Sequence, residues 1–268
     1  MNSAQLALTD SGATRITLIT EEGRSGYTFG AIAGQLTKDA VVGSSEMPIA
    51  VHHVAVDVKA SDSLIGGIAG TNETSDLFAS VEQLELNLNA ASISAGGVAG
   101  TNKGTLQAGA STLDVKDITL GSSGQDNRIG GVFGENRASV DHALAEKVTI
   151  TSSGADNRLG AIAGLNTGVL TAGQSSYAAI KATGEKTEAG GIAGRLETDT
   201  ATGLTAMIAD SVVLAGDGQL LHTTGAESAI GGIAGSAKNA VISNSIVQAV
   251  IPDYAALSVQ GPKQRPGG

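Results

Sequence analysis

The chain of 268 residues has no cysteine, no tryptophan and only 4 prolines. The lack of cysteine excludes disulfide bonds, thiolate zinc sites and cysteine nucleophiles. Aromatic residues make up only 2% of the chain, although 41% of it is hydrophobic. A core must therefore be built from small aliphatic side chains, which suits thin, closely spaced layers better than one bulky interior.

Positive charge is also scarce, because 16 lysines and arginines stand against 26 aspartates and glutamates, for a formal net charge of −10. A nucleic-acid partner needs a basic stripe that releases counterions from phosphates, and no such stripe is present. No apolar stretch approaches the roughly 20 residues of a membrane-spanning helix. We therefore expect neither nucleic-acid binding nor membrane insertion. The first residues include no basic region followed by an apolar run, so we expect no export signal within them.

Glycine is what the chain has in excess, with 38 residues, and much of it lies in one recurring pentapeptide. The pentapeptide reads Gly-[Gly/Ala]-[Ile/Val]-[Ala/Phe]-Gly, and successive copies are 30 to 41 residues apart. A near-constant period with insertions is typical of a solenoid, in which each coil returns the motif to one stacking position. The seven copies end at Gly34, Gly70, Gly100, Gly134, Gly164, Gly194 and Gly235.

Between the motifs, apolar residues alternate with polar ones, as in Leu84, Leu86 and Leu88. This period of two predicts strands with one buried face, and no long run has helical spacing. About 30 residues per coil accommodate two or three short strands, which predicts an all-β parallel β-helix of about seven coils, right-handed by the usual rule for parallel crossovers. We expect this domain over residues 1–255 and a flexible tail or linker over 256–268.

The pentapeptide itself is expected to alternate, with Ile68 and its equivalents stacked in a buried apolar column and Ala69 facing the other way. The glycines are expected either to adopt positive φ at a corner or to permit close backbone approach. An asparagine follows the last glycine by two positions in four copies, and an amide ladder along the stack is expected to satisfy turn carbonyls. These asparagines are Asn72, Asn102, Asn136 and Asn166.

Two adjacent coils share the sequence SSGxDNR, so a carboxylate and a guanidinium recur at one place in the repeat. Stacked, these residues form either a carbohydrate or cation site or a surface charge ladder of modest energetic value. They are Asp126, Arg128, Asp156 and Arg158.

The seven pentapeptides resemble the GLUG motif repeat, a Gly-Gly-[Leu/Ile/Val]-[Ala/Val/Phe]-Gly unit of bacterial secreted and cell-surface proteins that include large adhesins. The resemblance spans residues 30–235 and implies an extracellular or cell-surface location and a stalk or adhesion role. It brings no catalytic residue. The asparagine is missing after Gly34, Gly194 and Gly235, so the resemblance does not imply a complete ladder.

Three functions of different classes remain open at this stage. The first is a non-catalytic adhesive or stalk module that binds a host or bacterial surface protein or a glycan, without a cofactor or metal. The second is a structural subunit that associates end to end into filaments. A polysaccharide-active β-helix enzyme comes last, because the few aromatic residues do not cluster in register with the repeat. Adjacent His52 and His53 on a strand are expected to point to opposite faces, so they cannot both bind one metal. The longer coil between Gly194 and Gly235 favours a binding module.

Overall fold

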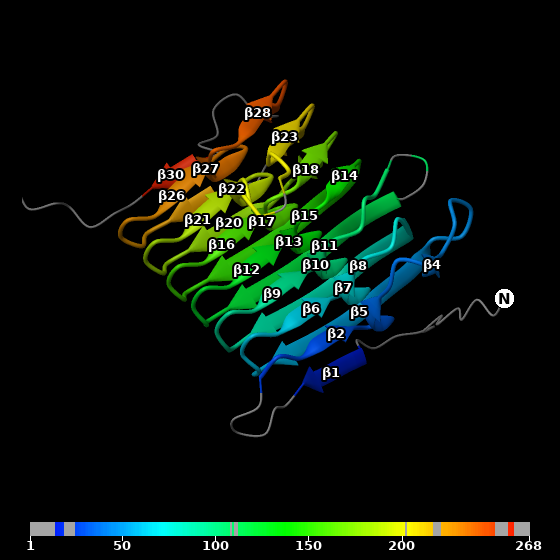
Figure 1. Cartoon of the computed structure of the whole chain (residues 1–268). Helices are drawn as coiled ribbons and strands as arrows, with labels where there is room; N and C mark the ends of the chain where they lie inside the picture. The colour runs from blue at the N-terminus through cyan, green and yellow to red at the C-terminus, as the bar shows by residue number, and fades with distance from the viewer. Residues whose placement is uncertain are drawn as a thin grey trace, which may run out of the picture.

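The computed structural model describes residues 14–18, 25–107, 109, 112–201, 203–216, 221–249 and 257–259. All regular structure in these residues is β-strand, and every strand pair is parallel. Two sheets contain seven strands each, one strand for each copy of the pentapeptide. The chain makes one full turn between each strand and the next in such a sheet, so the seven strands correspond to six full turns. The rungs are stacked in chain order along the molecule (Figure 1). The predicted parallel β-solenoid is therefore confirmed.

The widest side of the solenoid is a sheet of twelve strands, here called sheet I. Its central strands are the longest of the chain, so each turn contributes one long straight side. Its strands are β1 (Thr14–Leu18), β4 (Val41–Val42), β5 (Ile49–Val58), β8 (Asp76–Leu88), β11 (Thr112–Ser122), β15 (Ala143–Ser152), β19 (Gln174–Ser176), β20 (Ala179–Ala182), β24 (Val212–Ala215), β25 (Leu221–Thr223), β29 (Ile246–Ala249) and β30 (Leu257–Val259).

The remaining strands form three sheets that return each turn to sheet I. Sheet II consists of β2 (Thr28–Gly30), β6 (Leu64–Gly66), β9 (Ser94–Gly96), β12 (Arg128–Gly130), β16 (Arg158–Gly160), β21 (Glu188–Gly190) and β26 (Ala229–Gly231). Sheet III consists of β3 (Ala33–Leu36), β7 (Ala69–Asn72), β10 (Ala99–Asn102), β13 (Phe133–Asn136), β17 (Ala163–Asn166), β22 (Ala193–Glu197) and β27 (Ala234–Lys238). Sheet IV consists of β14 (Ser139–Asp141), β18 (Val169–Thr171), β23 (Met207–Ala209) and β28 (Val241–Ser243).

The apolar residues with a period of two fill the core, as the sequence predicts. Leu84, Leu86 and Leu88 of β8 are at most 1% exposed, and Ile118 and Leu120 of β11 are fully buried. Each of these side chains stacks on its equivalent in the next turn, because the strands pair in register along the stack. Burial of aliphatic columns, at about 25 cal/mol per Å² of apolar surface, is the main favourable term for such a rod.

The pentapeptide forms a corner between sheet II and sheet III rather than a strand of its own. Gly67 and Ile68 lie in the bend, and strand β7 begins at Ala69. The amides of Ile68 and Ala69 both donate to the carbonyl oxygen of Val98 in the next turn, at 3.0 Å each. Residues in a bend do not alternate between faces. The alternation expected from Ile68 therefore does not extend to Ala69. Ala69 was expected to face away from the core and is as fully buried as Ile68.

The motif glycines serve close backbone approach, not positive φ. A Cβ on Gly66 would lie 1.9 Å from the carbonyl oxygen of Ala69, and one on Gly100 would lie 2.6 Å from the amide nitrogen of Ile65. None of the glycines with positive φ in the described residues belongs to a pentapeptide. Sheets II and III therefore contact one another nearly backbone to backbone at the corner.

Positive φ is instead found on non-glycine residues that recur once per turn. The long strands of sheet I each bend at one such residue, and a second set precedes the strands of sheet II. The first set stacks in register and comprises His53, Gln83, Asp117, Lys147 and Tyr177. The left-handed conformation disfavours side chains other than those of glycine, asparagine and aspartate, so each corner stores a small strain that the stacked sheets hold in place.

Strand β1 is the first described strand of the solenoid, and β28 and β29 belong to its last described turn. Leu257–Val259, part of the segment expected to be a tail, pairs with β25 as strand β30. Pro252 and residues 260–268 of the expected tail lie outside the described residues.

Candidate functional site

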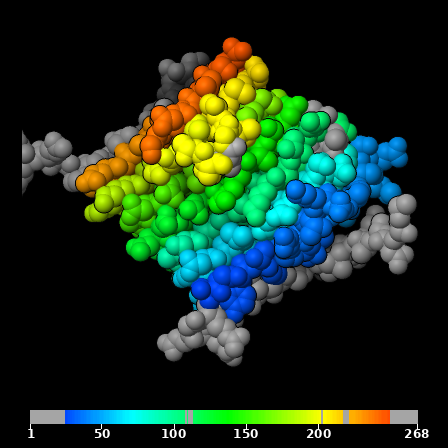
Figure 2. All heavy atoms as spheres, in the orientation of Figure 1, coloured from blue at the N-terminus to red at the C-terminus, as the bar shows by residue number. Residues whose placement is uncertain are grey.

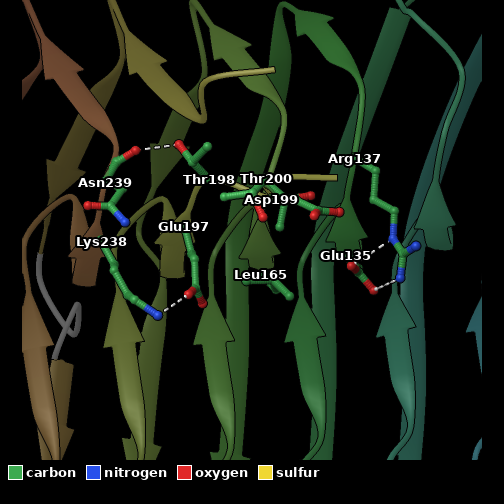
Figure 3. A pocket seen from close by; sticks show the side chains of 10 residues that line it. Glu135, Arg137, Leu165, Glu197, Thr198, Asp199, Thr200, Lys238 and Asn239 are labelled. Atoms are coloured by element: carbon green, nitrogen blue, oxygen red, sulfur yellow. Dashed lines mark hydrogen bonds and ion pairs between the residues drawn. The ribbon is translucent and has the colours of Figure 1, made fainter. Parts of the chain in front are cut away.

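A groove of about 410 Å³ opens beside sheet III, where strands of successive turns end. Five of its lining residues are charged and five are uncharged (Figure 3). This volume falls in the range of roughly 300 to 1,000 Å³ that is typical of small-ligand sites. The charged residues are Glu135, Arg137, Glu197, Asp199 and Lys238, and the uncharged ones are Leu165, Thr167, Thr198, Thr200 and Asn239.

One wall of the groove is an insertion in the longest turn. Asn166 pairs with Leu196, 30 residues on, whereas Val169 pairs with Met207, 38 residues on, so the loop between β22 and β23 carries eight extra residues. The yellow atoms of this turn stand on the face shown in Figure 2. The insertion leaves the strand register on both sides intact, and the sheet beneath it keeps its shape.

The insertion is held by hydrogen bonds at its base. The Thr198 hydroxyl donates to the carbonyl oxygen of Asn239 in the next turn and accepts from the amide of Ala206 at 3.0 Å. Asp199 accepts from the amide of Ala201 at 2.9 Å, which closes a tight turn of the kind aspartate favours. The described part of the loop is thus fixed on the solenoid at both of its ends.

The first ion pair of the groove joins Glu135, on strand β13, and Arg137, which directly follows that strand. Two hydrogen bonds from the guanidinium to the carboxylate measure 2.7 and 3.1 Å, and the Glu135 side chain is only 6% exposed. The hydrogen bond to Glu135 raises the pKa of Arg137, and Asp199 across the groove adds to this effect. A bidentate pair of this geometry fixes the direction of both side chains.

The second ion pair joins Glu197 on β22 and Lys238 on β27 at 2.7 Å. The hydrogen bond from Lys238 holds the pKa of Glu197 below its usual value. Arg195 lies 3.6 Å from the same carboxylate, so Glu197 faces two cations. Lys238 is 70% exposed, so this ion pair lies at the surface of the groove.

The structure stacks the predicted charge ladder and connects it to this groove. Arg128 and Arg158 are register partners in sheet II, and Asp126 and Asp156 share the same positive-φ position. Arg158 donates to Asp126 of the preceding turn at 3.0 Å. Arg128 instead lies 3.9 Å from Glu135 of the groove, so the four predicted residues form no closed site.

The ladder continues toward the groove through residues that the sequence pattern did not indicate. Glu188, the register partner of Arg158, binds Arg195 at 2.6 and 3.0 Å, and Arg195 contacts Glu197. The hydrogen bond with Glu188 raises the pKa of Arg195. Arg158 and Glu188 come from strands 30 residues apart that only the stacking of the turns brings together, whereas Glu188 and Arg195 lie seven residues apart on either side of one corner.

The expected amide ladder forms over four turns. Asn72 donates to Asn102 at 2.8 Å, Asn102 to Asn136 at 2.9 Å, and Asn136 to Asn166 at 2.7 Å, with all four side chains at most 1% exposed. Each amide also donates to the backbone carbonyl two residues further on. The ladder ends where leucines, Leu36 and Leu196, occupy the same register position. Its role in the described structure is therefore structural.

A second amide pair was missed from the sequence. Asn127 and Asn157 are fully buried in the bends that precede the strands of sheet II. The backbone N–H of Asn127 donates to the side-chain Oδ1 of Asn157 in the next turn at 2.7 Å. The signal was visible, because both lie between Asp and Arg in the repeated SSGxDNR segment.

The described residues hold no group of three or more His, Cys, Asp or Glu side chains arranged to bind a metal ion. His52 and His53 were expected on opposite faces, but His53 has a φ of 54° at the bend of β5 and both side chains are exposed. His52 lies 3.3 Å from Glu82. Nor does the described part of the chain include a helix of the length and hydrophobicity required to span a membrane.

Comparison with known proteins returns no match for this chain among family models, curated proteins or solved structures. The geometry of the solenoid and of the groove is therefore the basis for a functional hypothesis.

Proposed function

We propose that the chain is a non-catalytic, extracellular β-solenoid that acts as an adhesive or stalk module of a larger bacterial surface protein. The observation that carries this proposal is the insertion-built groove on an otherwise regular rod of stacked turns. Sites for partners commonly lie on loops positioned by a rigid scaffold. The resemblance of the seven pentapeptides to the GLUG repeat supports the same role.

The proposal is tested by adhesion under flow. Beads coated with the chain are passed over cultured epithelial cells and over immobilised bacterial cells, and their retention is compared with that of albumin-coated beads. An adhesive module retains the beads on at least one of these surfaces in a way that free chain competes away. Retention no greater than that of albumin beads on either surface contradicts the adhesive role.

End-to-end self-association is a second candidate, favoured by apolar side chains in the last described rungs of two sheets. Val241 and Ile242 of β28 are 43% exposed, and Ile246 and Val247 of β29 are 57% and 44% exposed. Stacked apolar strands with free edges are surfaces on which another chain can add. Size-exclusion chromatography with light scattering across concentration, followed by negative-stain imaging, distinguishes the two candidates: fibres support assembly, whereas a monomeric rod at every concentration contradicts it.

A further inference from the structure

The charges of the groove are already paired within the protein. Glu135 is paired with Arg137, and Glu197 with Lys238 and Arg195. Three carboxylates stand against two cations in the lining, so an anionic ligand is disfavoured. A cationic ligand would have to compete with Arg137 and Lys238 for the carboxylates that they already bind. The groove therefore suits a ligand without net charge.

Hydrogen-bonding groups of both kinds line the same groove. Carboxylate oxygens of Glu197 and Asp199 accept, the guanidinium of Arg137 and the ammonium of Lys238 donate, and the Asn239 amide and Thr200 hydroxyl do both. A hydroxyl group also donates and accepts, so a ligand that carries several hydroxyls can satisfy neighbouring donors and acceptors at once. An apolar ligand would displace water from these groups and offer them no hydrogen bond in return.

The groove also offers a small apolar surface. Leu165 lies between the two ion pairs (Figure 3), and three threonines, Thr167, Thr198 and Thr200, also line the groove. A ring whose faces carry C–H groups and whose edges carry hydroxyls matches this arrangement. None of the described residues that line the groove is aromatic, so they provide no ring platform for stacking and the affinity of a single site is low.

We infer that the groove binds a neutral oligosaccharide, with the sugar ring over Leu165 and its hydroxyls bonded to the charged side chains on either side. This inference rests on the proposed binding function and names its ligand class. The eight-residue insertion is then the specificity element, because it supplies Thr198, Asp199 and Thr200 to the lining of the groove.

The test uses the full chain, labelled and presented on multivalent beads, on a printed array of neutral, amino-substituted, sialylated and sulfated oligosaccharides together with basic and acidic peptides. We expect capture by neutral oligosaccharides and not by the sulfated or sialylated ones. Soluble neutral oligosaccharide is then titrated against the chain by calorimetry to compare variants.

Asn239→Gly removes one groove amide without backbone strain, because Asn239 has a φ of 50°. We expect it to weaken binding roughly threefold to tenfold, the value of one hydrogen bond. Its matched control is Asn244→Gly, at a φ of 47° and away from the groove lining, which should bind like the wild type. Deletion of residues 198–205 shortens the loop to the length found in the preceding turn and should abolish binding while the circular dichroism spectrum stays that of a β-rod.

The outcomes separate this inference from the proposed function. Capture of neutral sugars that survives both Asn239→Gly and the deletion overturns the groove as the site, and preferred capture of anionic sugars or of peptides overturns the ligand class. Absence of any sugar capture overturns the inference, while bead retention on cells in the same preparation leaves the adhesive role standing with another ligand.

Discussion

The buried asparagine ladder makes a sharp prediction for the substitution Asn102→Asp. This change replaces only the amide NH2 with an oxygen, so the shape of the side chain is kept. The Nδ2 of Asn102 donates to Asn136 Oδ1 at 2.9 Å and to the carbonyl of Gly104 at 3.1 Å. In the variant both contacts become contacts between acceptors, and each unsatisfied buried group costs about 1 to 3 kcal/mol. We expect a loss of about 2 to 6 kcal/mol in the free energy of unfolding.

The loss should depend on pH with a defined sign. Residue 102 is fully buried, so the pKa of the introduced carboxyl is raised in the folded state above its unfolded value of about 3.9. Below both values the neutral carboxyl still donates one hydrogen bond and the deficit is smallest. As pH rises between the two values the deficit grows by about 1.4 kcal/mol per unit, and it levels off above the folded pKa.

Urea denaturation followed by circular dichroism measures this deficit, as the difference between variant and wild type at about pH 4.5 and about pH 7.5. Asn89→Asp is the matched control, because Asn89 is exposed and its Oδ1 only accepts a hydrogen bond, from Ser123, which a carboxylate preserves. A variant that unfolds within about 0.5 kcal/mol of the wild type at the higher pH would refute the view that the ladder satisfies buried groups. A deficit that does not change with pH would refute the buried position of the carboxyl.

Three further predictions concern the corners and the groove. Gly100→Ala should lower the free energy of unfolding by about 3 kcal/mol or more because its Cβ meets backbone atoms at 2.6 and 2.7 Å, whereas Gly121→Ala, whose nearest neighbour is the Asn87 side chain at 3.3 Å, should change it by less than about 1 kcal/mol in the same urea assay. Gln83→Gly should stabilise the chain by about 0.5 to 1 kcal/mol, because Gln83 is exposed and has a φ of 56°. Gln35→Gly, in strand β3, should destabilise it. A Gln83→Gly variant less stable than Gln35→Gly would contradict strain at the bend. Lys238→Met should raise the pKa of Glu197 in an NMR titration of side-chain carboxyls, because the hydrogen bond that lowers this pKa is lost. The ionised Glu197 stabilises the wild type above its unfolded pKa, and this contribution is lost as pH falls through the lower folded pKa, so it should be smaller in the variant. An unchanged pKa would show that the pair does not form in solution.

The regular part of this fold could be read from the sequence, because stacking repeats one local rule. Alternating residues such as Leu84 and Leu86 predicted buried strand faces, and the recurrence of an asparagine two positions after the last glycine, as at Asn72 and Asn102, predicted the ladder. The corner was misjudged because alternation was extended through Gly67 and Ile68, where the chain bends. The glycines left two alternatives open, and the crowding at Gly66 decides for close approach.

The groove could not have been predicted from one sequence. Glu135, Leu165, Glu197 and Lys238 come from four different turns, and their meeting depends on the lateral register of sheet III. The long period before Gly235 marked an insertion but not where it lies in the turn. The predicted charges Asp126 and Arg158 do lie in adjacent turns. The ion pairs that connect them to the groove, however, involve Glu188 and Arg195, which belong to no repeated motif.

The parallel pairing of every strand with its equivalents in the neighbouring turns has a mechanical consequence. The hydrogen bonds between turns all lie along the stacking direction. When opposite ends of the rod are pulled apart along that direction, all the bonds between two turns carry the load together and must fail together. When an edge strand is lifted away from the sheet by one of its ends, its hydrogen bonds fail one after another. The direction of pulling therefore decides whether this rod behaves as a strong link or as a zipper.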